Sequence, residues 1–169
     1  MVAQNRDVAA PKTILESLSG TRVLVVEARY YEDIADELLA GARGAIEAVG
    51  AEARVFTVPG ALEIPAATAI LLKAGERRGE PYDAVVALGC VIRGETGHYD
   101  IVAGESARAL MDLSVAERLP LGNGILTVET MEQALVRARV SQMNKGGGAA
   151  EAALSLVAIK RAANLESAR

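Results

Sequence analysis

Four short apolar runs alternate along the chain with stretches in which apolar residues recur every three or four positions. The first and third runs are almost continuously apolar, which is typical of strands buried on both faces. The runs predicted as strands cover residues 22–28, 53–58, 84–92 and 124–128. Five helices are predicted, over residues 33–49, 62–74, 101–118, 130–137 and 149–163. Gly50 ends the first of these helices, and Thr130 with Gln133 forms a T-x-x-Q capping box at the start of the fourth.

This alternation of strands and helices predicts an α/β fold, with a four-stranded parallel sheet and helices on both faces. The first eighteen residues are predicted to be an N-terminal arm, where Pro11 argues against a helix. Residues 19–169 are predicted to form a single domain, because no internal repeat or long linker divides them.

Composition narrows the classes of function. Charge or glycine interrupts every apolar run well before the length of a membrane span, so we expect a soluble protein. The net charge is −4 and basic residues are scattered, which argues against binding of nucleic acid. No secretory signal is recognisable, and a single cysteine cannot form an internal disulfide, so we expect a cytoplasmic protein. A mean hydropathy of +0.22 is high for a small domain and favours a subunit interface.

Four polar segments follow the four predicted strands. In parallel α/β sheets, ligands bind beyond the carboxyl ends of the strands, and we call that side of the sheet the ligand edge. The segments predicted at the ligand edge are "ARYY", "PGALE", "RGETGHYD" and "ETMEQALVR". The third holds His98, which is the only histidine. With one histidine and one cysteine, the chain lacks the ligands for a zinc or iron site, and no metal is expected.

The segment around His98 has two interpretations. An imidazole at this edge can transfer protons near neutral pH, but an exposed loop histidine with no such role is the alternative. Gly94 would let the backbone approach an anion, which the amides of Glu95 and Thr96 could bind, or the segment could be an ordinary strand-to-helix turn. No dinucleotide-binding, P-loop or G-x-S-x-G motif is present.

The other edge residues also have alternatives. Glu63 suits the dipole of the helix it begins, or it could accept hydrogen bonds from a heterocycle alongside the backbone of Ala61 and Leu62. Tyr30 could stack on such a ring or be a half-buried loop aromatic. Cys90 is interpreted as a small core residue. Two cations, Arg137 and Lys145, could be solvated surface residues. Together these residues predict a site for a polar heterocycle and a small phosphate.

Five stretches taken together resemble the lumazine synthase family: "ARYY", "VPGALEIP", "ALGCVIRGETGHYD", "GNGILTVETMEQALVRA" and "NKGG". The resemblance runs from about residue 21 to residue 163. It implies condensation of 5-amino-6-(D-ribitylamino)uracil with 3,4-dihydroxy-2-butanone 4-phosphate in riboflavin biosynthesis. The products would be 6,7-dimethyl-8-ribityllumazine, phosphate and water, and no cofactor or metal is implied.

The resemblance also implies roles for individual residues. His98 matches the residue proposed to transfer protons, and Lys145 matches a lysine near the site. Phosphate binding is implied for Glu95, Thr96 and Arg137. Binding of the pyrimidine is implied for Tyr30, Ala61, Leu62, Glu63, Cys90, Val91, Ile92 and Asn123.

The family's fold is a flavodoxin-like three-layer sandwich that assembles as a pentamer. The resemblance therefore implies a site between neighbouring subunits, with Arg137 and Asn123 contributed by the adjacent subunit and the N-terminal arm paired with a neighbour's sheet. Asn123 stands where many members carry Phe or Trp, which puts the affinity for the pyrimidine in doubt. The segment "RARVSQMNKG" lacks the glycine pattern of capsid-forming members, which favours a free pentamer over a sixty-subunit shell and leaves a decamer open.

Two other classes of function stay open at this point. A weakly active relative could serve as a binding protein for a lumazine or flavin, and Asn123 leaves room for unusual affinity. A structural shell protein is the third class. His98, Glu63, Thr96 and Arg137 together favour an enzyme over a binding protein, and the missing glycine pattern argues against a shell protein.

Overall fold

A computed structural model describes residues 18–167 of the chain. Within this part of the chain strands and helices alternate as the sequence predicts, and the sheet contains four strands. The strands are β1 (Arg22–Ala28), β2 (Glu52–Val58), β3 (Ala84–Ile92) and β4 (Leu121–Val128). The helices are α2 (Glu32–Ala48), α3 (Glu63–Arg77), α4 (His98–Ala116), α5 (Met131–Ala138) and α6 (Lys145–Ser167).

All strand pairs are parallel, and the strand order is β2-β1-β3-β4. This order corresponds to the first four strands of a flavodoxin-like sheet, so the predicted fold class is confirmed. The two central strands, β1 and β3, are buried along almost their whole length. Of the outer strands, β4 alternates between buried and more exposed positions, and β2 is exposed or half-buried throughout. The two continuous apolar runs are buried strands, as predicted, and they are also the strands with a neighbouring strand on each side.

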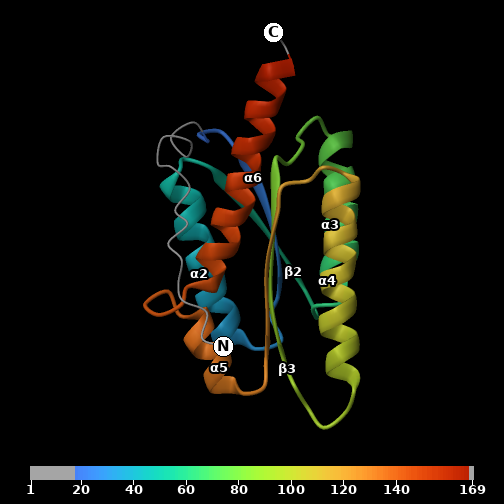
Figure 1. The fold of residues 1–169 in the computed structure, drawn as a ribbon, viewed down its shortest axis with the longest axis vertical. Helices are drawn as coiled ribbons and strands as arrows, with labels where there is room; N and C mark the ends of the chain where they lie inside the picture. Colours follow the sequence, from blue (N-terminus) through green and yellow to red (C-terminus); the bar gives the residue numbers. More distant parts are fainter. Residues whose placement is uncertain (1–17, 168–169) are drawn as a thin grey trace.

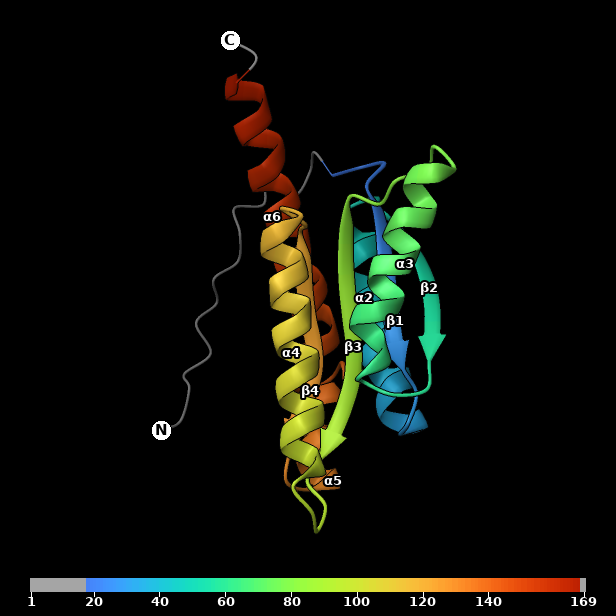
Figure 2. The ribbon, with the colours of Figure 1, turned by 90° about the vertical axis from the view of Figure 1, so that its right-hand side faces the viewer.

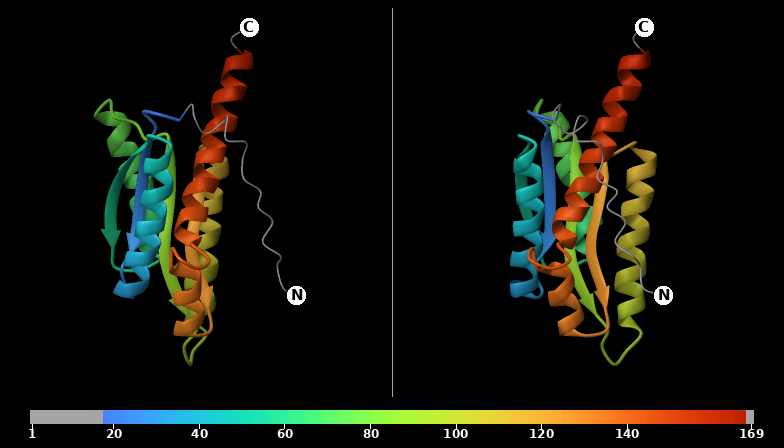
Figure 3. Two further views of the ribbon diagram at one scale, coloured as in Figure 1. Left: turned by 90° about the vertical axis from the view of Figure 1, so that its left-hand side faces the viewer. Right: turned by 60° about the vertical axis from the view of Figure 1, so that its left-hand side comes forward.

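The sheet lies between two layers of helices, which Figure 1 shows edge-on. Helices α3 and α4 cover one face (Figure 2), and α2, α5 and α6 cover the other (Figure 3). Successive residues of β1 face opposite layers: Val23 and Val25 pack towards α2 and α6, and Leu24 and Val26 pack towards α3. Leu18, the last residue of the predicted arm, is also buried in the α2–α6 core. The other residues of the arm lie outside the described residues.

The start of α6 corrects the prediction. The sequence places residues 145–148 in a loop, because three consecutive glycines disfavour a helix, yet α6 begins at Lys145. Asn144 caps this helix, since its Oδ1 accepts a hydrogen bond from the Gly147 N–H at 3.2 Å. A Cβ at Gly146 would overlap the Leu38 carbonyl oxygen of α2. The glycines therefore allow α6 to pack directly on the backbone of α2.

The first residue of β4 is the second correction, because this strand begins at Leu121, three residues before the predicted start. A Cβ at Gly122 would overlap the Ala149 carbonyl oxygen of α6. The glycine in this strand thus marks a close approach of two backbones. The other predicted boundaries, apart from the end of α6, lie within three residues of those in the structure.

Candidate active site

A cavity of about 460 Å³ opens at the ligand edge, between the segments that follow β1, β2 and β3. Parallel pairing brings the carboxyl ends of these strands to the same edge. Its lining includes nine of the residues singled out from the sequence: Tyr30, Ala61, Leu62, Glu63, Cys90, Val91, Ile92, Thr96 and His98. The structure thus brings together residues that lie up to sixty-eight positions apart in the sequence.

Two tyrosines from the β1–α2 loop form one wall. The ring centroids of Tyr30 and Tyr31 are 5.0 Å apart at an interplanar angle of 73°, an edge-to-face arrangement. Tyr30 is 74% exposed, so most of its ring is accessible to a ligand. Partial burial raises the pKa of the Tyr31 phenol, and this side chain therefore stays protonated at neutral pH.

The β2–α3 loop forms the second wall. Its backbone turns through Gly60, where the Glu63 N–H donates to the Gly60 carbonyl at 3.2 Å and α3 begins. A Cβ at Gly60 would lie 3.0 Å from Glu63 Oε2. Glycine therefore leaves room for the exposed Glu63 carboxylate to stand over the loop, beside the backbone of Ala61 and Leu62.

The end of β3 forms the floor, with Cys90 and Val91 buried. Burial raises the pKa of the Cys90 thiol to about 11, because the interior disfavours the thiolate. A protonated thiol is a poor nucleophile, and Cys90 also packs in the α2–α6 core. The interpretation of Cys90 as a small core residue is confirmed.

His98 is the first residue of α4 and lies exposed at the cavity, next to the β3–α4 loop. Its backbone N–H donates to Thr96 Oγ1 at 3.4 Å, which satisfies one of the free N–H groups at the start of the helix. The cavity therefore combines an aromatic ring, a carboxylate, a hydroxyl and an imidazole. Such a set can bind a polar heterocycle and move protons on it.

Residues 20–161 match the family model described as 6,7-dimethyl-8-ribityllumazine synthase. The chain belongs to this family. A protein of that name from Methylorubrum populi is 86% identical over 169 residues, which cover all of both chains. The corresponding protein of Methylobacterium radiotolerans is 73% identical over 164 residues, 97% of each chain. That of Xanthobacter autotrophicus is 61% identical over 161 residues, covering 95% of this chain and 98% of its own.

Four residues that the lumazine synthase resemblance singles out do not line the cavity of the same chain: Glu95, Asn123, Arg137 and Lys145. Asn123 lies within β4, where its Oδ1 accepts the Ile125 N–H at 3.0 Å. The Arg137 guanidinium donates to the Gln133 carbonyl of its own helix at 3.0 Å. Among the described residues of one chain, no arginine or lysine lines the cavity.

Three further side chains line this lumazine synthase cavity and were not predicted from the sequence: Tyr31, Tyr99 and Val102. Val102 follows His98 by four positions, so helical spacing alone would place both on one face once α4 is known to begin at His98. Tyr99 was not predicted to line the cavity, because the predicted helix began at residue 101 and left Tyr99 in the preceding loop. Tyr31 could have been predicted to line the cavity, because it is an aromatic residue next to Tyr30.

Arg93 lies outside the cavity and packs against Tyr99, which lines it. Its guanidinium lies 3.9 Å from the centroid of the Tyr99 ring and pairs with Asp100 and Glu129 at 3.1 and 3.2 Å. The hydrogen bonds that Arg93 donates to Asp100 and, to a lesser degree, to Glu129 raise the pKa of Arg93. Because Glu129 follows β4, this cluster joins the β3–α4 loop to the β4–α5 loop.

Two further findings concern membranes and metals. No helix within residues 18–167 is both long and apolar enough to cross a membrane. Over the same part of the chain, no three His, Cys, Asp or Glu side chains gather in the way that a metal site requires.

Proposed function

We propose that this cavity condenses 5-amino-6-(D-ribitylamino)uracil with 3,4-dihydroxy-2-butanone 4-phosphate to give 6,7-dimethyl-8-ribityllumazine. The observation that carries the proposal is the convergence of Tyr30, Glu63 and His98 on one cavity in a chain of this family. The cavity volume of about 460 Å³ falls within the usual range for a small-molecule site.

The pyrimidine lies between the first two walls. Tyr30 stacks on its face, because the exposed ring offers a flat apolar surface. The Glu63 carboxylate and the backbone of Ala61 and Leu62 hydrogen-bond the ring and the ribityl chain. The backbone of residues 90–92 contributes further hydrogen bonds from the end of β3.

The reaction transfers protons at each step. The 5-amino group attacks the ketone carbon and water leaves as the imine forms. Phosphate is then eliminated, and the ribitylamino nitrogen closes the ring with loss of a second water. His98 accepts and returns protons at these steps, since an imidazole serves as both base and acid near pH 7. Because the amine is already nucleophilic, holding the two substrates together provides much of the acceleration.

The phosphate binds at the turn of Glu95 and Thr96 and is paired by Arg137 of a neighbouring subunit, with Lys145 nearby. Support for a shared site comes from the positions of Arg137 and Asn123, which lie outside the cavity of their own chain. A cavity with no cationic side chain among the described residues needs one for a phosphate dianion. We accordingly propose a homopentamer, with a decamer as the alternative.

The proposed enzyme is cytoplasmic and works without a cofactor or metal. Its single cysteine is buried and unpaired, as expected of a protein in a reducing compartment. Residues 19–169 act as one domain, and residues 1–18 as an arm that meets a neighbouring subunit.

The first test is to mix the purified protein with both substrates and follow lumazine fluorescence and phosphate release against a reaction without protein. Both signals should rise together above the spontaneous rate. Tight binding of a lumazine or flavin without any acceleration would instead support the binding-protein alternative. Sedimentation of the same sample would distinguish a pentamer from a decamer or a shell.

Mixed subunits test the shared site. His98→Ala and Arg137→Ala chains are unfolded together in equal amounts and refolded. If each site takes His98 from one subunit and Arg137 from its neighbour, about a quarter of the sites in random mixtures should be intact. Each variant refolded alone is the control. No recovery in the mixture would show that both residues act within one chain.

A further inference from the structure

We infer that Glu27 is a positioning residue for the pyrimidine substrate. Its carboxylate sets the distance between the β1–α2 loop, which carries Tyr30, and the β2–α3 loop. This inference rests on the proposed roles of Tyr30 and residues 61–63. Glu27 does not line the cavity, so it acts through other residues.

Glu27 is unusual because it is a carboxylate within a buried central strand. It is 3% exposed and follows Val23 and Val25 on the face of β1 that packs towards α2 and α6. A carboxylate in such surroundings is costly unless charged and hydrogen-bonding partners surround it.

Those partners come from two other parts of the ligand edge. Both Glu27 carboxylate oxygens accept hydrogen bonds from Arg29 Nη1 at 3.3 Å, and Oε1 accepts one from Thr57 Oγ1 at 3.0 Å. Arg29 also pairs through Nη2 with Asp36 in α2. We call these four residues, Glu27, Arg29, Asp36 and Thr57, the Glu27 cluster.

The Glu27 cluster joins the two walls that hold the pyrimidine. Arg29 immediately precedes Tyr30, so the pairs to Glu27 and Asp36 fix both sides of the β1–α2 loop. Thr57 is the register partner of Glu27 on β2 and lies three residues before Gly60. One carboxylate therefore connects the aromatic ring to the backbone segment that faces it.

Stability alone does not account for this carboxylate. Well-packed apolar residues often replace a buried ion pair with no loss of stability, so an apolar side chain would satisfy the fold of a central strand. What an apolar residue would lose is the directional connection between the β1–α2 loop and β2.

The consequence is selective for one substrate. The phosphate turn lies on the β3–α4 loop, which belongs to the other half of the sheet and has its own cluster around Arg93. Weakening the Glu27 cluster should therefore affect the pyrimidine and leave the butanone phosphate bound as before.

The experiment measures KM for each substrate, with the other saturating, in Glu27→Gln. We expect KM for the pyrimidine to rise roughly tenfold, because a wall displaced by a fraction of an ångström binds the ring less well. KM for the butanone phosphate and kcat should stay within about twofold of the original values. Equal rises in both KM values, or a fall in kcat alone, would overturn the inference.

A second pair of variants covers the case in which Glu27→Gln does not fold. Thr57→Val removes only the hydroxyl, at almost constant volume, and should raise KM for the pyrimidine about threefold. Thr57→Ser keeps the hydroxyl and should restore the original KM. If Thr57→Val and Thr57→Ser behave alike, the hydrogen bond to Glu27 has no positioning role.

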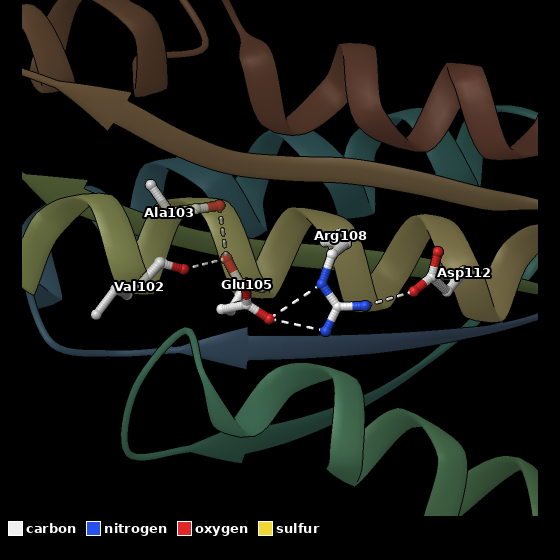
Figure 4. A network of polar contacts seen from close by, with 6 residues as sticks. Val102, Ala103, Glu105, Arg108 and Asp112 are labelled. Atoms are coloured by element: carbon white, nitrogen blue, oxygen red, sulfur yellow. Dashed lines mark hydrogen bonds and ion pairs between the residues drawn. The ribbon is translucent and has the colours of Figure 1, made fainter.

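The control variant is Glu105→Gln. On α4, Arg108 bridges Glu105 and Asp112 at 2.7 Å each, as Arg29 bridges two carboxylates, but this cluster is exposed on a helix surface (Figure 4). Both KM values should be unchanged in this variant. A rise in the pyrimidine KM here as large as in Glu27→Gln would contradict the inference.

Tyr30→Ala separates the two proposals. If it raises KM for the pyrimidine while the Glu27 and Thr57 variants do not, the inference fails and the proposed role of Tyr30 stands. If it leaves that KM unchanged, the proposed role of Tyr30 fails and the inference fails with it.

Discussion

Two arginines at the ligand edge, Arg29 and Arg93, each bridge two carboxylates, but their surroundings differ. The Glu27 side chain that pairs with Arg29 is 4% exposed, whereas Asp100 and Glu129 around Arg93 are 65% and 59% exposed. The first cluster joins β1, β2 and α2, and the second joins two loops. Asp36, the other partner of Arg29, is 68% exposed, so water and salt screen that pair and the whole second cluster but hardly reach the Glu27 carboxylate. The Arg29–Glu27 contact should therefore differ in energy from the exposed pairs.

The two halves of the ligand edge also differ in their proposed function. The half built on β1 and β2 carries the proposed pyrimidine walls, and the half built on β3 and β4 carries the proposed phosphate turn and His98. A rigid, buried connection suits recognition of a flat heterocycle. Solvated ion pairs suit loops that must exchange protons and phosphate with water.

Removal of the buried carboxylate should give the largest effect on stability. Glu27→Ala leaves Arg29 without its main buried partner and opens a cavity, so we expect the free energy of unfolding to fall by about 3 kcal/mol. Urea denaturation followed by circular dichroism measures this change. Glu27→Leu, which fills the space, should be clearly less destabilised, and equal losses in the two variants would argue against the ion pair.

The phosphate half should give the largest effect on the reaction. Arg137→Ala should lower kcat/KM about a hundredfold, because it removes the cation that we propose to pair with the phosphate. His98→Ala should lower it only about tenfold, since water can replace part of the proton transfer. Steady-state kinetics checks the ranking, which is wrong if His98→Ala abolishes turnover and Arg137→Ala barely changes it.

Cys90 lies in β3, at the boundary of the two halves, and provides a test of burial by pH. With a pKa of about 11 in place of 9.0, the native thiol should hold roughly a hundredfold less thiolate at pH 8 than an unfolded chain. Alkylation by iodoacetamide, followed by mass spectrometry with and without urea, measures the difference.

The raised pKa of Cys90 also means that its contribution to stability is retained below pH 9 and lost as the pH rises towards 11. Cys90→Ser should remove that alkaline loss.

The exposed cluster should give the smallest effect. Arg93→Gln breaks two solvated ion pairs, so the free energy of unfolding should change only slightly at low salt, and far less than in Glu27→Ala. The change should shrink further in about 0.5 M salt, because surface charges are screened at this concentration. A loss comparable to that of Glu27→Ala would remove the distinction between the two clusters.

The elements predicted best from the sequence are those with an unbroken physical signal. The boundaries of β1 and β3 match the prediction, because burial on both faces leaves a continuous apolar run. The predicted start of α6 is wrong. Consecutive glycines disfavour a helix, but here they are needed inside α6 because another backbone packs directly against it. That requirement comes from α2, which lies about a hundred residues earlier in the chain.

The candidate site could be predicted where chemistry and strand ends coincide. Tyr30, Glu63, Thr96 and His98 each follow a strand, and the parallel topology brings them to one cavity. The Glu27 cluster could not be predicted in this way, because the pairing of Glu27 with Thr57 depends on the register of two strands. The roles of Arg137 and Asn123 depend on a second subunit and remain predictions.

The glycines between α2, α6 and β4 have a consequence for genetics. Gly146 and Gly122 lie outside the cavity lining, yet any side chain there would push two backbones apart. In a riboflavin auxotroph rescued by this gene, alleles at these codons should behave as temperature-sensitive folding mutants with intact chemistry. A map of intolerant codons would therefore show two separate groups, one that marks the reaction and one that marks how closely the helices meet.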